Sequence, residues 1–212
     1  MSNLTTQLPT DTWVVASWDE YIKQIEDPAY EKAKGYYYNG QMRVEMLPVG
    51  SDHSCDHAML IFAITLFATL RGIPLTARDN CTYRKIESRE CQPDISYYVG
   101  DRARLIPRGT SIIDLDRYPA PDLAIEVADS SLLTDQGAKR LLYEDLQVAE
   151  YWVVDVQKAQ ILAYSVADRG SKRIDVSQVL PGLAIALLED TLRHSQEADQ
   201  TQAGAWLLSQ LQ

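Results

Sequence analysis

The stretch "APDLAIEVADSS", residues 120–131, has the pattern of a buried strand but carries two acids within its apolar run. Successive side chains of a strand point to opposite faces of the sheet. One face is apolar and consists of Leu123, Ile125 and Val127. The opposite face holds Asp122, Ala124, Glu126 and Ala128. Because unpaired carboxylates are costly to bury, two acids on one face of a core strand predict a functional cleft.

The elements around this strand predict a single α/β domain over residues 1–212. Hydrophobic periodicity predicts helices over residues 17–27, 54–71, 132–147 and 199–212, and strands over residues 81–87, 93–99, 121–127, 150–156 and 159–168. A hairpin should turn at Asn39-Gly40, a strong two-residue turn signal. This order predicts a mixed central sheet flanked by helices, preceded by the N-terminal hairpin and by a loose tail over residues 1–12.

Composition indicates a soluble protein of a reducing compartment. The chain has 212 residues, of which 46% are hydrophobic, enough for a sizeable core. Its three cysteines form no Cys-x-x-Cys pair, which argues against a disulfide framework and a cysteine-rich zinc module. The N-terminus lacks the pattern of a signal peptide, and no apolar run reaches the ~18 residues that cross a bilayer. We therefore expect a cytoplasmic protein without membrane contact.

Charge is unevenly distributed along the chain. The formal net charge is −10, whereas proteins that bind nucleic acid mainly through phosphates normally present a basic face. Residues 78–108, however, contain seven Arg or Lys and five Asp or Glu, a local balance of +2. This segment is either a nucleic-acid contact or a solvated hairpin of mixed charge.

The carboxylate partner of Glu126 should come from a neighbouring strand. Asp122 lies four residues away, about 13 Å at the rise of a strand, which is too far for one ion to bind both. The earlier strand "QPDISYYV" offers Asp94, which adjacent pairing would bring close to Glu126. Hard oxygen ligands of this kind suit Mg²⁺ or Mn²⁺.

The following helix places a lysine on its inward stripe. Lys139 lies among Leu132, Leu142, Tyr143 and Leu146 at helical spacing, with Asp135 one turn before it. The lysine could simply pair with Asp135 or extend its amine to solvent. Facing two acids, it could instead orient a water or offset charge on a phosphorus centre.

The succession "PDISYY", "PDLAIEVADSS", Lys139 and Tyr143 in a helix, and "EYWVVD" resembles the restriction-endonuclease-like PD-(D/E)XK superfamily. More narrowly, it looks like a bacterial branch described as endonucleases of unknown function. The resemblance runs from about Trp18 to Leu188, with a catalytic core of about residues 54–167. It implies that Asp94 is the first-strand aspartate and Glu126 the acid of the (D/E)-x-K element. That element expects lysine where this chain has Ala128, and in the resembling branch the following helix supplies the lysine, where Lys139 stands.

Three further residues are candidates for supporting roles. Asp122 fits an outer or structural position at the strand entry. His53 and His57 are spaced i, i+4, as in some metal sites, but they also lie in a natural helix start. The resemblance keeps a supporting role at the cleft open for His53. Glu45 is either a third acid or an exposed strand residue.

These residues predict a divalent-metal-dependent phosphodiesterase that acts as a DNA endonuclease, with Asp94 and Glu126 as metal ligands and Lys139 positioning the water. The Val127 carbonyl is a possible further ligand. A homodimer is expected because cutting both strands of a symmetric site needs two centres. The alternatives are a catalytically idle protein- or nucleic-acid-binding module and an RNA or nucleotide phosphodiesterase. Replacing Lys139 by Ala should alter stability if the lysine is structural, and cleavage alone if it is catalytic.

Overall fold

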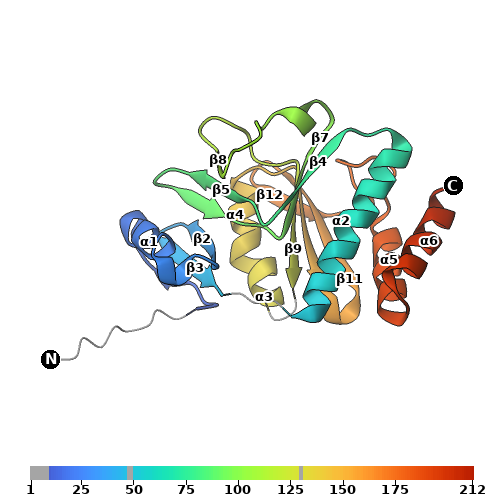
Figure 1. Cartoon of the computed structure of the whole chain (residues 1–212). Helices are drawn as coiled ribbons and strands as arrows, with labels where there is room; N and C mark the ends of the chain where they lie inside the picture. Colours follow the sequence, from blue (N-terminus) through green and yellow to red (C-terminus); the bar gives the residue numbers. More distant parts are fainter. Residues whose placement is uncertain (1–9, 47–49, 129–130) are drawn as a thin grey trace.

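The computed structural model describes residues 10–46, 50–128 and 131–212. The predicted tail over residues 1–12 lies mostly outside them, since residues 1–9 are not described. Two six-stranded sheets lie side by side (Figure 1). The α/β class with mixed sheets flanked by helices is confirmed, but the chain divides its strands between two sheets where the sequence predicted one.

The first sheet contains the predicted hairpin and has the strand order β1-β3-β2-β6-β5-β8. Its strands are β1 (Val14–Val15), β2 (Lys34–Tyr38), β3 (Gln41–Glu45), β5 (Thr82–Lys85), β6 (Arg89–Cys91) and β8 (Ile112–Asp114). The hairpin turns as predicted, because Asn39 and Gly40 both adopt positive φ, at 51° and 72°. The antiparallel register pairs Lys34 with Glu45, so these two side chains share one face.

The second sheet holds the opening stretch and has the order β12-β11-β10-β9-β7-β4. Its strands are β4 (Leu75–Asp79), β7 (Ile95–Val99), β9 (Leu123–Ala128), β10 (Glu150–Asp155), β11 (Gln160–Ala167) and β12 (Gly170–Arg173). Strand β9 is parallel to β10 and antiparallel to β7. Every residue of β9 and β10 is buried, as expected for central strands covered on both faces.

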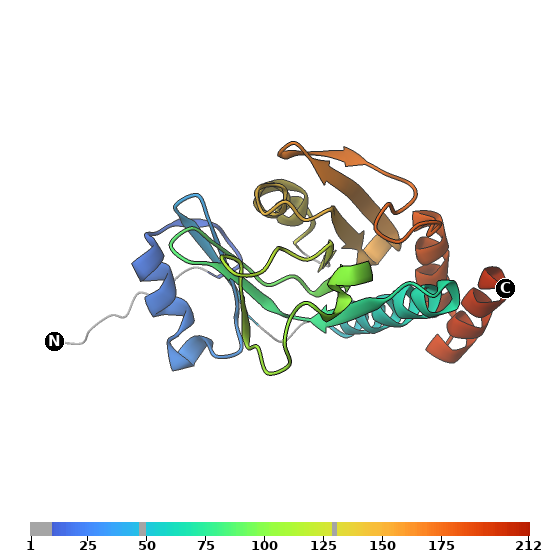
Figure 2. The same ribbon diagram turned by 90° about the horizontal axis from the view of Figure 1, so that it is seen from above.

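Helices lie on either side of the two sheets (Figure 2). The helical segments are α1 (Trp18–Ile25), η1 (Pro28–Tyr30), α2 (Ser51–Arg71), η2 (Gly100–Arg104), α3 (Leu132–Thr134), η3 (Asp135–Lys139), α4 (Arg140–Asp145), η4 (Val156–Lys158), α5 (Ile185–Glu197) and α6 (Gln200–Leu211). Helix α1 begins with a capping box between Ser17 and Glu20. The sequence analysis missed α5, because its residues lie outside every predicted helix and strand.

The two faces of β9 separate as its alternation predicts. Leu123, Ile125 and Val127 belong to a core shared with α2, α5 and α6. Ala124 and Ala128 belong to a second core, which α4 and the first sheet complete. The face that carries Glu126 is therefore enclosed by protein and not by solvent.

Helix α2 corrects the expectation that no segment could cross a bilayer. The span Ser51–Arg71 is long and apolar enough to do so by length and composition. Core helices of soluble proteins share these features, and α2 packs against β9, α5 and α6. It begins three residues before the predicted start and ends at Gly72, whose φ of 65° suits the left-handed cap of a helix.

Candidate active site

Asp94 and Glu126 meet across neighbouring strands. The register of β7 and β9 pairs Ile95 with Ile125, which places Asp94 beside the end of β9. There the backbone N–H of Val127 donates to Oδ2 of Asp94 at 2.7 Å. Because N–H and C=O of one strand residue point to the same edge, the Val127 carbonyl also faces Asp94. Asp94 therefore lies beside the Glu126-Val127 segment of β9, and its charge acts on Glu126.

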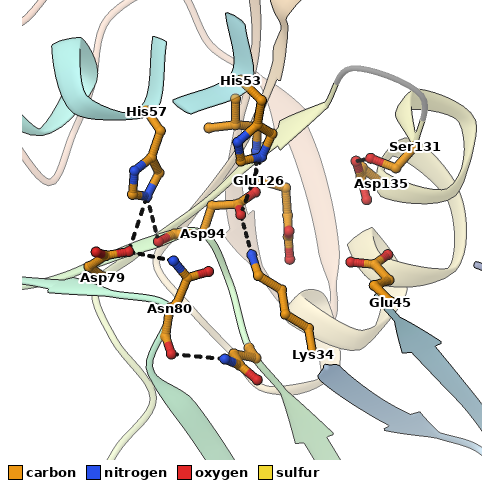
Figure 3. Close-up of polar contacts among 12 residues, drawn as sticks. Lys34, Glu45, His53, His57, Asp79, Asn80, Asp94, Glu126, Ser131 and Asp135 are labelled. Carbon is orange, nitrogen blue, oxygen red and sulfur yellow. Dashed lines mark hydrogen bonds and ion pairs between the residues drawn. The ribbon is translucent and has the colours of Figure 1, made fainter. Parts of the chain in front are cut away.

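Asp94 contacts one lysine and two histidines (Figure 3). Its side chain is 3% exposed, and Oδ1 forms an ion pair with Nζ of Lys34 and lies 3.5 Å from Nε2 of His53. The ring Nε2 of His57 also lies 2.9 Å from the main-chain carbonyl oxygen of Asp94. Burial alone would raise the pKa of Asp94, but the hydrogen bond from His53 and the charge of Lys34 outweigh it and hold the pKa well below its usual value. Asp94 is therefore an anion throughout the physiological range.

Glu126 has a contrasting environment. It is 1% exposed and accepts hydrogen bonds from the hydroxyl of Tyr143 at 2.6 Å and from that of Tyr36 at 3.2 Å. Burial raises the pKa of Glu126 to about 8, although the charge of Lys139 opposes the change and that of Asp94 adds to it. Two neighbouring carboxylates thus have pKa values pushed in opposite directions, which is a property of functional sites.

Lys139 lies at the centre of the charged cluster of the site, which consists of Lys34, Glu45, His53, Asp94, Glu126, Asp135 and Lys139. Its Nζ lies 3.3 Å from Glu126, 3.0 Å from Glu45 and 3.0 Å from Asp135, and 4.1 Å from the centre of the Tyr36 ring. The side chain is 1% exposed. Burial disfavours its charge, but the surrounding carboxylates outweigh this and hold the pKa of Lys139 well above its usual value. The lysine is an ammonium ion at the centre of three acids.

The predicted helix that carries this lysine is broken at Gly137. The sequence predicted one helix over residues 132–147, whereas the chain forms α3, a wide turn η3 and then α4. Gly137 departs from helical geometry inside η3, with φ of −102° and ψ of −107°. On either side of it, Asp135 and Lys139 are both buried. The inward position of Lys139 agrees with the prediction, and the break directs Asp135 inward as well.

The three candidates for supporting roles occupy different places. His53 contacts Asp94 directly, within the cluster. Glu45 also belongs to it: Arg43 and Lys139 bind its carboxylate, so it is not the exposed strand residue that the sequence favoured. Asp122 lies at the opposite end of β9, where it accepts a hydrogen bond from the backbone N–H of Val99 and pairs with Arg102.

The sequence analysis did not assign roles to Lys34 and Tyr36. Both come from β2 and share the face that carries Tyr38, by strand alternation. The signal that could have found them is the Asn39-Gly40 turn, because its register sets Lys34 opposite Glu45. Their approach to Asp94 and Glu126 joins the first sheet to the second.

The donor set suits a hard divalent cation, with few protein ligands. Asp94, Glu126 and the Val127 carbonyl supply oxygen atoms, and Mg²⁺ usually takes only one or two carboxylates and keeps several waters. Within residues 10–46, 50–128 and 131–212, no group of three or more His, Cys, Asp or Glu has metal-holding geometry. The residues thus fit an ion that binds with water and a phosphate, and not a closed structural site such as those that hold zinc.

Comparisons with known proteins agree with this geometry. A family model described as "Uma2: Putative restriction endonuclease" matches residues 18–200. No relative was found among the curated proteins. One solved structure with a similar fold is that of "a putative nuclease belonging to DUF820 from Anabaena variabilis ATCC 29413", at 20% identity and a TM-score of 0.59, with 83% of this chain and 98% of that chain covered. The chain belongs to the Uma2 family, and its resemblance to the restriction-endonuclease-like superfamily is confirmed.

Proposed function

We propose that this protein is a divalent-metal-dependent endonuclease that hydrolyses phosphodiester bonds of DNA. Family membership supports a nuclease function in general. The observation that carries the DNA endonuclease proposal is the position of Asp94, which accepts a hydrogen bond from Val127 next to Glu126, while Lys139 contacts Glu126 at 3.3 Å. Two carboxylates can hold a divalent cation, and an ammonium beside them can orient a water and offset charge on a phosphate.

Each residue has a distinct task in this proposal. Asp94 and Glu126 would hold Mg²⁺ or Mn²⁺, with the Val127 carbonyl beside them. The ion would polarise the scissile phosphate and lower the pKa of a bound water. Lys139 would orient the attacking water and offset the charge that develops on the phosphate. The low pKa of Asp94 keeps one ligand ionised, and binding of a cation would favour ionisation of Glu126.

Access to the centre involves the β2–β3 hairpin. This hairpin supplies Lys34, Tyr36 and Glu45, and their contacts enclose Asp94 and Glu126, which are 3% and 1% exposed. We infer that a phosphate reaches these acids when the hairpin moves away from β9. We infer that substrate binding replaces the contact of Lys34 with Asp94.

The burial of both acids also favours a second candidate, a catalytically idle nuclease-fold protein that binds nucleic acid or protein. In that case Lys34 and Lys139 would neutralise the cluster permanently. A protein of this kind would bind partners without cleaving them in any divalent metal. Cleavage of RNA alone would assign the phosphodiesterase activity to a different substrate.

The test is conversion of supercoiled plasmid DNA to open and linear forms in Mg²⁺, Mn²⁺ or EDTA. We expect metal-dependent cleavage by the wild type and its loss in Asp94→Asn and Glu126→Gln. The matched control is Asp190→Asn, since Asp190 forms an exposed ion pair with Arg193 on α5, far from the cluster. Equal activity of all four proteins would indicate a contaminating nuclease, and inactivity of the wild type on DNA in both metals would refute the proposal.

Cutting both strands would be easiest for a pair of chains, and we propose a homodimer on this ground. Sedimentation velocity with and without duplex DNA measures the assembly directly. A monomer in both conditions would contradict the dimer but not the cleavage of single phosphodiester bonds.

A further inference from the structure

A basic cavity opens beside the edge strand of the second sheet. Its volume is about 800 Å³, and β4 and the segment after η2 form its walls. The side chains that could recognise a ligand are Thr76, Arg78, Arg104, Arg108 and Thr110. Among the described residues, none that lines it is acidic. The net charge of the chain is −10, so the sign of the charge is reversed at this cavity, where three arginines lie without an acid among the described lining residues.

The three arginines have no acidic partner among the residues that the structure describes. Within the described part of the chain, no Asp or Glu pairs with Arg78, Arg104 or Arg108. Nε of Arg78 is buried and has no hydrogen-bond partner among the described residues. Arg102, in the same segment, differs because it is committed to Asp122 and the Ala120 carbonyl. The cavity thus holds guanidinium donors that the fold itself does not use.

An aromatic ring of the second sheet lies beside one of these arginines. The guanidinium of Arg78 lies 5.9 Å from the centre of the Tyr98 ring. Tyr98 and Ile106 belong to the core on the Glu126 side of the second sheet. The cavity therefore opens on the same face of that sheet as the candidate active site.

The register of three strands sets the distance between the two sites. Arg78 is paired with Ser96, and Ser96 with Ala124, which lies two residues before Glu126. Arg78 is two strand spacings across the sheet and two residues along it from Glu126, about 10 Å and about 7 Å, which together give about 12 Å. One DNA strand advances ~3.4 Å per nucleotide along the duplex axis, so this separation corresponds to about three to four nucleotides. A strand with its scissile phosphate at Glu126 could therefore place a neighbouring phosphate near Arg78.

We propose that this cavity is a phosphate-binding site for the DNA backbone next to the cleaved bond, with Arg78, Arg104 and Arg108 as its donors. The inference rests on the proposed nuclease function and adds the path of the substrate across β4. Arginine presents a planar fork of donors that matches phosphate oxygens. Backbone contacts of this kind set position and register and do not read sequence.

The test is the salt dependence of DNA binding, measured by fluorescence anisotropy of a labelled duplex in EDTA, where cleavage is excluded. The slope of log K against log salt is negative, and each lost phosphate contact should reduce its magnitude by ~0.9. In a triple Arg→Gln variant at positions 78, 104 and 108, the magnitude of the slope should therefore fall by up to about three. Its affinity at low salt should fall at least tenfold. The triple Arg→Lys variant keeps the charges and should retain most of the slope.

The matched control is Arg173→Gln on β12, at the opposite edge of the same sheet. Arg173 also lies over a tyrosine, 5.3 Å from the ring of Tyr164, and forms no ion pair within the described residues. It should bind DNA as the wild type does. If the triple variant unfolds, the same measurement is made on Arg104→Gln and Arg108→Gln. Both side chains are exposed, so their replacement should leave the fold intact.

The outcomes separate the two proposals. Unchanged affinity and slope in a folded triple variant, or no binding of DNA by the wild type, would overturn the cavity assignment. Plasmid cleavage by the wild type would leave the nuclease function standing in that case. A reduced slope in the triple variant combined with an inactive wild type would support the cavity and refute the catalytic proposal.

Discussion

The ammonium of Lys139 lies 3.3 Å from the carboxylate of Glu126, and both side chains are 1% exposed. The same ammonium contacts Glu45 and Asp135. One cation thus contacts three carboxyl groups, of which those of Glu126 and Asp135 are almost fully buried. A lysine in this position supports the fold whether or not it takes part in catalysis.

Replacing Lys139 with Met should therefore destabilise the protein strongly. Removing one partner of a buried ion pair typically costs about 3–5 kcal/mol, because the remaining charges are left uncompensated. The loss should be smallest near pH 4 and grow toward pH 8, since the unfolded chain ionises its carboxylates over that range while the buried acids of the variant resist ionisation. Urea unfolding of both proteins at several pH values measures it.

This expectation revises the simple test that the sequence suggested, in which an unchanged melting temperature would mark a catalytic lysine. An inactive and unstable Lys139→Met variant would not separate the two roles. Lys139→Arg provides the separation: it keeps the cation, so it should recover much of the stability, while the altered geometry should leave cleavage impaired. Full recovery of cleavage in Lys139→Arg would contradict a positioned catalytic amine.

Metal binding should release a proton near neutral pH. Burial raises the pKa of Glu126 to about 8, so the group is mostly protonated below that pH and must ionise to bind a cation. The affinity for Mn²⁺ should rise up to ~10-fold per pH unit below about pH 8 and level off above it. Titration calorimetry at pH 7 in two buffers of different ionisation enthalpy should give close to one proton released per ion.

The control for this measurement is Glu126→Gln, which should lose saturable Mn²⁺ binding. Asp94 cannot supply the released proton, because its pKa is held well below its usual value. Affinity that does not change between pH 6 and pH 8 would show that Glu126 is not a ligand.

The sequence predicted the elements of this site better than its contacts. Alternation along β9 placed Glu126 and Ala124 opposite Val127, and helical spacing placed Lys139 inward, because both signals are local. The pairing of Lys34 with Asp94 joins residues 60 positions apart, in different sheets. No local period encodes such a contact, which depends on how the two sheets pack.

The break at Gly137 shows a second limit. Helical periodicity continues through residues 132–147, so the pattern predicts one helix and gives no sign of the wide turn η3. A glycine inside a helical pattern lowers the helix propensity but does not determine where a chain bends. Tertiary contacts decide this, here the burial of Asp135 against Lys139 and Ser131.

Replacing Lys34 with Met should strengthen binding of Mn²⁺ while it weakens cleavage. The ammonium of Lys34 and a divalent ion compete for the same oxygen of Asp94, so removing the lysine removes a competitor. The released lysine is also free to contact a phosphate in the wild type, which explains the expected loss of activity. Calorimetry and plasmid cleavage test the two effects separately, with Lys158→Met as a control because Lys158 is exposed and pairs with Asp155. Weaker Mn²⁺ binding in Lys34→Met would instead assign the lysine to holding Asp94 in position.

Asp122→Asn should affect stability and leave chemistry intact. Asp122 accepts a hydrogen bond from the backbone N–H of Val99 at 2.8 Å and pairs with Arg102, at the end of β9 away from Glu126. Loss of the charge weakens both contacts, and a buried hydrogen-bond partner that is left unsatisfied costs about 1–3 kcal/mol. Thermal unfolding should show this loss, while cleavage per folded molecule should match the wild type. A folded Asp122→Asn that is as inactive as Asp94→Asn would place Asp122 in the catalytic machinery, since weakening a contact at the far end of β9 would not by itself abolish cleavage.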